Sequence, residues 1–255
     1  MRLRLASDLD LLTNWEVRIC LLQTQSSNAS LCAKLITDLS RRFPKQEHEP
    51  FHLEHRLFTD TSSQLPSADI KQRAFTHIFS SSHDTRRAFV HATKPEGENG
   101  SSITVPIGSA EIFTGLLVSK MQPLWFPRSM LSLENGVSVP LKDDTWRICI
   151  GELKVAPRSP GAGNLRGTII ELYKADDSNL AIADKQLSAE EIAETQEMFS
   201  DILRQIFRGT EETFSNAKFS VSRTQIRASD QEEHQHQDPD WELAKLYMTA
   251  LRGQR

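Results

Sequence analysis

The amino-acid sequence predicts an α+β fold, in which an antiparallel sheet that is barrel-like or strongly curved is flanked by about four helices. Many short segments carry an apolar residue at every second position, which is the period of a strand with one buried face. About four other segments repeat their apolar residues at helical spacing. In the middle of the chain, the strand-like segments 145–155 and 168–173 flank a stretch rich in Pro and Gly, which predicts an antiparallel hairpin with a long loop over 158–167.

The first strand of this hairpin changes its apolar phase part-way along. Trp146, Ile148 and Ile150 alternate with other residues, but three positions then separate Ile150 from Leu153. One extra residue in a strand moves all the following side chains to the other face. We therefore expect a β-bulge near 151–152. The hairpin contains no arrangement of residues that resembles a reaction centre.

The segments before the hairpin predict a strand, a helix and then several more strands. Residues 15–23 alternate as a strand, and the helix that follows ends at Arg42, before Pro44. Asn28 or Ser30 can cap this helix. Further strands are expected at 51–58, 74–79, 87–92, 103–105 and 130–133.

A second helix and a turn are expected before the central hairpin. Residues 109–121 carry apolar side chains at helical spacing, and Ser109 is the expected cap. Pro123 and Pro127 are expected to end this helix. The sequence Glu-Asn-Gly at 134–136 predicts a turn that ends the preceding strand.

The C-terminal third contains the most clearly marked helix. Ser188 and Glu191 form an S-x-x-E capping box, and apolar residues then recur at helical spacing as far as Ile206. Gly209 follows the last turn, where it favours termination of the helix. A late strand is expected at 214–221.

The chain ends in a polar segment and a final helix. Residues 223–238 are charged and polar, which predicts a disordered linker. Asp238 and Pro239 then have the residue types of a helix cap and a first helical position, so a helix is expected over 239–251. The apolar stripe of this helix comprises Trp241, Ala244, Tyr247, Met248 and Leu251. This stripe could bind a partner or dock the helix onto its own sheet, and we favour docking.

Length and composition are typical of a globular protein. The chain has 255 residues, of which 38% are hydrophobic and 25% charged, and we expect one domain over 1–255. Within it, 1–14 has the character of an atypical N-terminus rather than of a signal peptide, because Asp8 and Asp10 interrupt its apolar run. The net charge of −4 gives no support for direct nucleic-acid binding. No run approaches the ~18 apolar residues that a membrane span requires.

The three cysteines, Cys20, Cys32 and Cys149, are odd in number and form no C-x-x-C pair. A disulfide framework or a cysteine-rich zinc site is therefore not expected. Buried free thiols in the reducing environment of the nucleus or cytosol are the interpretation we favour. Cys149 alternates with core isoleucines inside a strand, so we expect it to be structural rather than a nucleophile.

The other candidate sites favour structural roles. Gly161, Gly163 and Gly167 resemble a dinucleotide fingerprint, but the third glycine comes one residue late and a strand follows, so a hairpin loop is expected. Glu47 and Glu49 form a Glu-x-Glu in a loop before Pro50, whereas the metal-binding carboxylate pairs of phosphohydrolase barrels lie on inward-facing strands and occur in more than one copy.

The histidines show no metal-binding spacing on a helix. His234 and His236 lie in the expected linker. The remaining candidates form no H-E-x-x-H or H-x-x-E-H pattern; they are His52, His55, His77, His83 and His91. We therefore predict no catalytic, cofactor-binding or metal-binding residues and leave the partner-binding residues unassigned.

Three stretches together resemble a known family. They are the F-H-L-E-H-R-L-F-T-D-T segment at 51–61, the hairpin over 146–173 and the W-E-L-A-K-L-Y-M-T-A-L-R segment at 241–252. In order and spacing they resemble Mediator complex subunit 20 in the form found in filamentous fungi. The helices expected at 112–121 and 188–208 fall where that family has them, whereas 1–14 does not match.

The resemblance implies a nuclear, non-enzymatic subunit of the Mediator head, a transcription coactivator assembly. The implied fold is a barrel-like sheet flanked by helices and loosely related to the TATA-binding protein. The implied partners are Mediator subunit 18, other head subunits and, indirectly, RNA polymerase II, with no cofactor, nucleic acid or membrane. The alternatives are a phosphohydrolase barrel, which needs a second inward Glu-x-Glu pair, and a barrel that binds a small ligand, which needs a large internal cavity.

Overall fold

The structure is a computed structural model of the chain. It describes residues 17–24, 29–61, 73–93, 100–122, 124–141, 146–155, 164–174, 180–181, 189–207, 218–223, 225–226 and 239–252. The chain forms two compact units. Unit 1 comprises Met1–Phe51, Glu134–Leu153 and Leu165–Leu246, and unit 2 comprises His52–Leu133, Lys154–Asn164 and Tyr247–Arg255.

The described helices are α2 (Ala29–Arg42), α3 (Ile107–Ser119), α4 (Ala189–Ile206) and α6 (Pro239–Arg252). The strands are β1 (Val17–Thr24), β2 (Glu49–Asp60), β3 (Phe75–Ser81), β4 (Asp84–Thr93), β5 (Ser101–Pro106), β6 (Trp125–Leu141), β7 (Trp146–Val155), β8 (Asn164–Lys174), β9 (Leu180–Ala181), β10 (Lys218–Arg223) and β11 (Gln225–Ile226). The predicted α+β class with about four helices is therefore confirmed.

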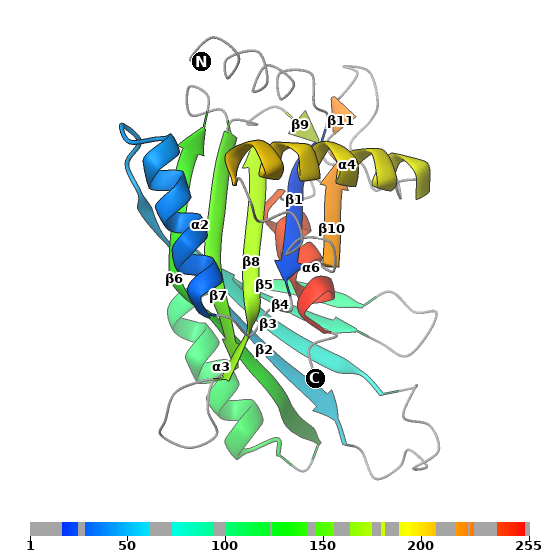
Figure 1. Cartoon of the computed structure of the whole chain (residues 1–255). Coiled ribbons are helices and arrows are strands. Elements are labelled where there is room, and N and C mark those ends of the chain that lie inside the picture. Colours follow the sequence, from blue (N-terminus) through cyan, green and yellow to red (C-terminus); the bar gives the residue numbers. More distant parts are fainter. Residues whose placement is uncertain are drawn as a thin grey trace. The chain divides into compact units, whose positions relative to one another are not determined.

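Unit 1 contains the strand order β10-β1-β8-β7-β6, with the central hairpin strands β7 and β8 next to each other (Figure 1). Strand β1 pairs antiparallel with both β8 and β10. One face of these strands packs against α2 and α4 in a continuous core. Leu35 and Leu39 of α2, Phe199 and Leu203 of α4 and Trp146 of β7 are all buried in it. The apolar stripes of the two predicted helices thus pack on the buried sheet face that the alternation in β7 had predicted.

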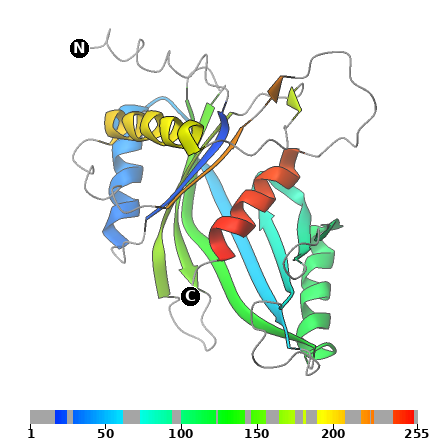
Figure 2. The same ribbon diagram turned by 90° about the vertical axis from the view of Figure 1, so that its right-hand side faces the viewer.

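Unit 2 contains the strand order β6-β2-β3-β4-β5, and β3 and β4 form a hairpin through the short turn at Ser82 and His83. On one face, Ile78 of β3 and Val90 of β4 pack against Leu117 of α3. Neighbouring residues of a strand point to opposite faces. The side chain of Phe79, next to Ile78, accordingly stacks on Tyr247 from the last turns of α6, with ring centroids 5.2 Å apart. In Figure 2, β3 and β4 are cyan, α3 is green and α6 is red.

The strands end in free edges rather than closing into a barrel. In the described strand order, β10 and β5 each pair with one neighbour only, β1 and β4 respectively. The described strands therefore form an open sheet within the predicted α+β class. None of the described helices is both long and apolar enough to cross a bilayer.

Several predicted boundaries were wrong, and β6 differs most. It runs continuously through Pro127 and through 134–136, where a turn was expected. Asn135 adopts a positive φ of 52° inside this strand, and its side-chain amide donates a 3.2 Å hydrogen bond to the Glu152 carboxylate of β7. The Glu-Asn-Gly sequence therefore marks a local irregularity of a long strand, which Asn tolerates better than most residues.

The start of α3 and the ends of two polar segments also differ from the prediction. Helix α3 begins at Ile107 rather than at Ser109, and Pro106 precedes it without a side-chain cap. Strand β8 begins at Asn164, inside the expected loop, and Gly167 has a φ of 151° within it. Strand β11 occupies two residues of the expected linker and pairs with β9.

Other boundaries agree closely. Helix α2 ends at Arg42 and α6 begins at Pro239, as predicted. The predicted caps Asn28, Ser188 and Asp238 lie outside the described residues, while Ser30 lies inside α2. The bulge expected near 151–152 remains a prediction.

Candidate functional site

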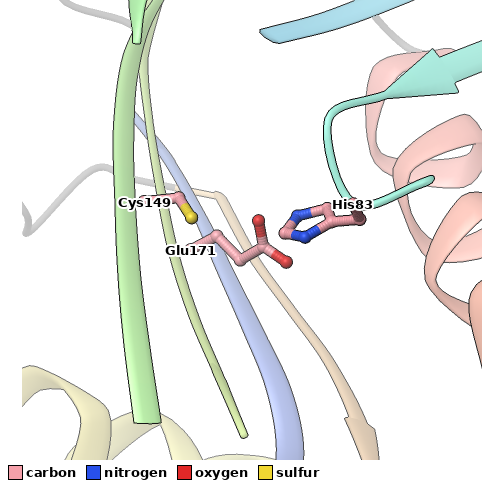
Figure 3. A group of neighbouring side chains, drawn as sticks. All are labelled: His83, Cys149 and Glu171. Carbon is pink, nitrogen blue, oxygen red and sulfur yellow. The ribbon is translucent and has the colours of Figure 1, made fainter. Parts of the chain in front are cut away.

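The face of the unit 1 sheet opposite α2 and α4 carries polar side chains. Cys149 of β7 and Glu171 of β8 project from adjacent strands, and Figure 3 labels both. Each is fully buried, with 0% of its surface exposed. The alternation that places Ile148 and Ile150 under the helices is what places Cys149 on this second face.

Burial keeps the Cys149 thiol protonated. It raises the pKa of the thiol well above its ordinary value, and the nearby Glu171 carboxylate raises it further, while a hydrogen bond with Ser138 opposes the change. The pKa of Tyr173 on the same face is also raised, mainly by burial. A nucleophilic cysteine needs the opposite environment, one that favours the thiolate. The structural role expected for Cys149 fits this geometry.

Glu49 of the Glu47-x-Glu49 motif forms an ion pair with a guanidinium. It is the first residue of β2, and it accepts two hydrogen bonds from Arg147 of β7, one of them 2.9 Å from Nη2 to Oε1. The pKa of Glu49 is lowered, chiefly by this bonding, and that of Arg147 is raised by it. The motif therefore lies at a strand start, where one carboxylate ties β2 to β7.

Figure 3 also labels His83, which lies in the β3–β4 turn and belongs to unit 2. Within unit 1, Cys149 and Glu171 offer two ligand atoms, and structural zinc sites use about four. Among the described residues, neither unit by itself brings together three His, Cys, Asp or Glu ligands. We assign no metal site to these side chains.

A row of histidines crosses three strands of unit 2, and two of its members, His55 and His77, are buried. His55 Nε2 lies 3.0 Å from His77 Nδ1, and the two rings stack at 5.2 Å. His77 is the cross-strand partner of His91, whose Nδ1 lies 2.8 Å from Ser102 Oγ. Burial lowers the pKa of His55 to about 4, and burial together with the nearby His55, His91 and Arg252 lowers that of His77 to about 3.

Sequence patterns could have located this row only in part. His55 alternates with the apolar residues Leu53 and Leu57, which places it on a buried face of β2. The juxtaposition with His77 and His91 depends on strand register, which no short motif records. Both rings of the His55–His77 pair are neutral and hydrogen-bonded, so they behave as core residues.

The C-terminal part of the apolar stripe of α6, from Tyr247 on, packs within unit 2, in agreement with the docking favoured from the sequence. In unit 2, Tyr247 and Met248 are buried, and the Arg252 guanidinium lies 4.3 Å over the Phe75 ring of β3. Gly161, Gly163, His234 and His236 lie outside the described residues.

The exposed large apolar side chains of the described residues all belong to unit 2. They are Ile103, Ile107, Ile112, Leu116, Val118, Leu124, Phe126 and Met130. Four of them lie on α3, which also buries Ala110 and Leu117 in the core of unit 2. A concentration of this kind is typical of a surface that another molecule covers. This surface is the candidate interaction site of the chain.

A charged cluster and a recess adjoin α3. The Arg56 guanidinium of β2 donates to both carboxylate oxygens of Glu111 on α3 and, at 2.7 Å, to Glu54. A recess of about 410 Å³ opens beside the start of the helix. Its walls include His52, Leu53, Glu54, Ser80, Ser82, Asp84, Ile107 and Leu133.

The comparison with protein families identifies the fold. The profile described as "TATA-binding related factor (TRF) of subunit 20 of Mediator complex" matches residues 15–252, which is nearly the whole chain. The chain belongs to the Mediator subunit 20 family. The resemblance expected from the three sequence stretches is confirmed, and the chain has the role of a subunit of the Mediator complex in transcription.

Solved structures with related shapes were also found, at low similarity. The PH1819 protein of Pyrococcus horikoshii is 12% identical, with 82% of this chain and 94% of that chain covered and a TM-score of 0.38. The Schizosaccharomyces pombe Mediator head module contains a chain that is also 12% identical, with 74% and 94% covered and a TM-score of 0.36. No curated protein sequence matches the chain.

Proposed function

We propose that this Mediator subunit is a non-enzymatic scaffold of the head module that pairs with Mediator subunit 18. It acts in the nucleus, contacts RNA polymerase II only through other subunits, and binds neither nucleic acid nor membrane directly. The observation that carries the proposal is the family match over residues 15–252. The exposed apolar side chains of unit 2 support it, because they supply the surface that a subunit contact needs.

The condition of the potentially reactive groups supports a role without catalysis. Cys149 is a buried thiol, Glu49 is held by Arg147, and His55 is buried and neutral. A general base or nucleophile works from a pKa near the working pH and from a position that a substrate can reach. Cys149 and His55 meet neither condition. Arg147 lowers the pKa of Glu49, which moves it further from the working pH.

The alternative of a phosphohydrolase barrel rests on carboxylates that would hold a metal ion inside the sheet. Both carboxylate oxygens of Glu49 accept hydrogen bonds from the Arg147 guanidinium, which therefore competes with a metal cation for the same oxygens. The alternative of a barrel that binds a small ligand requires a closed wall, and the described strands form an open sheet.

The proposal is tested by purification of an affinity-tagged chain from nuclear extracts of the organism that encodes it. Mass spectrometry should then identify Mediator head subunits, subunit 18 among them, in near-stoichiometric amounts. Recovery of the tagged chain without any Mediator subunit would contradict the proposal. A phosphate-release assay with added Mg²⁺ or Mn²⁺ on the same preparation tests the enzymatic alternative.

A further inference from the structure

The outer face of α3 is apolar and uncovered. Ile112 is 74% exposed and Leu116 is 44% exposed. Residues three and four apart share one face of a helix, so Gly108, Gly115 and Ser119 belong to the same face as these two side chains. This set of five residues is called the α3 outer face below. It contains no charged residue.

Helix α3 is therefore apolar on both sides. Its inner side buries Ala110 and Leu117 against β3 and β4. A helix on the surface of a protein normally presents charged residues to water, whereas one that is apolar all round is covered on all sides. Within the whole stretch 101–119, Glu111 is the single charged residue. The missing cover of α3 must come from outside the described residues.

The shape of the outer face suits a second helix. Ile112 and Leu116 are spaced i, i+4 and form a ridge, and the flanking glycines leave hollows beside it. A methyl group placed on Gly108 or on Gly115 would meet no other atom within 4 Å. Packed helices insert such ridges into the grooves of their neighbours, and small residues let the two backbones come close.

The charge beside the outer face favours a basic partner. Arg56 is shared by two carboxylates, those of Glu54 and Glu111, so the cluster as a whole carries one negative charge. Glu111 retains 68% exposure of its side chain, so a cation on a partner can reach it. A Lys or Arg on the flank of the docked helix would complement this charge.

A second copy of this chain fits less well. A helix of 13 residues is about 20 Å long and 10 Å wide, so one face offers on the order of 200 Å². A stable interface buries about 800 Å² from each partner, so either occupant needs further contacts and area alone does not distinguish them. Pairing of two copies through α3 would also bring two negative clusters together across the symmetry axis, which is unfavourable.

We propose that the α3 outer face is the docking site for an amphipathic α-helix of Mediator subunit 18, a helix that bears an apolar stripe and a Lys or Arg on the flank facing Glu111. This inference rests on the proposed function, because it assigns the surface on which that pairing takes place. The remaining interface area would come from the exposed side chains next to α3, such as Ile103 and Ile107.

The test compares matched variants of the full chain in binding to purified subunit 18 of the same organism, measured by isothermal titration calorimetry. Leu116→Asp and Ile112→Asp place a charge on the outer face. Ala33→Asp is the control, because Ala33 is exposed on a different helix, α2 of unit 1, and the change places the same charge outside the α3 outer face. We expect Leu116→Asp and Ile112→Asp to weaken binding more than about tenfold, and Ala33→Asp to weaken it less than about threefold.

An uncharged variant distinguishes a loss of binding at the docking surface from a loss caused by the effect of an added charge on folding. Gly115→Leu fills the hollow with an apolar side chain and favours the helical state, so the chain remains folded. It should also weaken binding about tenfold or more by preventing close approach of the two backbones. Circular dichroism of each variant verifies that its helix content equals that of the unchanged chain.

Each outcome decides the inference. If the unchanged chain binds subunit 18 and the outer-face variants bind equally well, the docking site is wrong while the proposed function stands. Equal weakening by Ala33→Asp would show that the effect is not specific to this face and would also overturn it. If the unchanged chain does not bind subunit 18 at all, the proposed function and this inference both fail. A photo-reactive residue at position 112 should cross-link to a helix with the stated pattern, and a cross-link to a strand or loop would contradict the proposal.

Discussion

His55 Nε2 lies 3.0 Å from His77 Nδ1 in the interior of unit 2, on the face of β2 and β3 where Tyr247 stacks on Phe79. Both imidazoles are buried, with exposures of 0% and 2%. This pair is most stable when both rings are neutral, because a buried cation is poorly solvated and because protonation of both rings would remove the acceptor of the hydrogen bond.

This pair predicts a loss of stability in mild acid. The folded-state pKa values of His55 and His77, about 4 and about 3, lie below the ordinary value of 6.5, so the unfolded chain takes up protons that the folded chain refuses. Stability is therefore greatest above pH 6.5 and falls as the pH drops toward 4. At about 1.4 kcal/mol for each pH unit between the two values, His55 alone removes on the order of 3 kcal/mol.

Urea unfolding at a series of pH values between 7.5 and 4 measures this effect. The slope of the unfolding free energy against pH should become shallower in His55→Leu, because leucine has no group that can be protonated. His52→Leu, on the same strand, should retain the steep slope. An identical slope in His55→Leu and in the unchanged chain would show that His55 is not the residue responsible.

Arg56 is predicted to hold α3 to β2. Its side chain is 12% exposed and donates to Glu54 and Glu111. Arg56→Met should reduce the free energy of unfolding by about 1–2 kcal/mol, because charge-assisted hydrogen bonds are lost while both carboxylates can still turn to water. Arg41→Met is the matched control: Arg41 is 77% exposed beside Asp38, and its removal should cost less than about 0.5 kcal/mol. Equal costs for the two variants would contradict the assignment.

Tyr247 is predicted to anchor the last turns of α6. Its ring is fully buried and stacks on Phe79 of β3. Tyr247→Ala should cost about 3–5 kcal/mol through the cavity it leaves, whereas Tyr247→Phe keeps the ring and should cost less than about 1.5 kcal/mol. Thermal unfolding followed by circular dichroism measures both. A small effect of Tyr247→Ala would mean that α6 contributes little to unit 2.

Gly167 is predicted to be required by the backbone of β8. Its φ of 151° lies where side-chain-bearing residues are rarely found, so Gly167→Ala should destabilise the protein by more than about 1 kcal/mol. Gly115→Ala makes the same change in the helical α3 with free space around it, and should stabilise by about 0.5–1 kcal/mol. The opposite signs of the two changes in denaturant unfolding are the expected result, and a neutral Gly167→Ala would contradict it.

The sequence predicted the elements whose apolar pattern is regular. Strand β7 and helices α2 and α4 followed from alternation or helical spacing, because each buries one face in the core of unit 1. Only a short part of strand β6 was predicted, at 130–133, because Pro127 and Asn135 are residue types that favour breaks and turns. Pairing with neighbours on both sides overrides that local preference, and Asn135 accommodates it with a positive φ.

The candidate site was less predictable, because it depends on what the fold leaves uncovered. Apolar periodicity in α3 predicted a helix but could not distinguish Leu117, which is buried, from Leu116, which is exposed. The bond between Glu49 and Arg147 joins residues 98 positions apart, and the histidine row depends on register between strands. No local spacing rule contains these relationships.

The central claim, that the chain is a scaffold that pairs with Mediator subunit 18, is tested most directly by reconstitution. The two chains are co-expressed and analysed by size-exclusion chromatography with light scattering. We predict a single peak with the mass of a 1:1 complex. A monodisperse monomer of this chain, with subunit 18 eluting separately, would contradict the account.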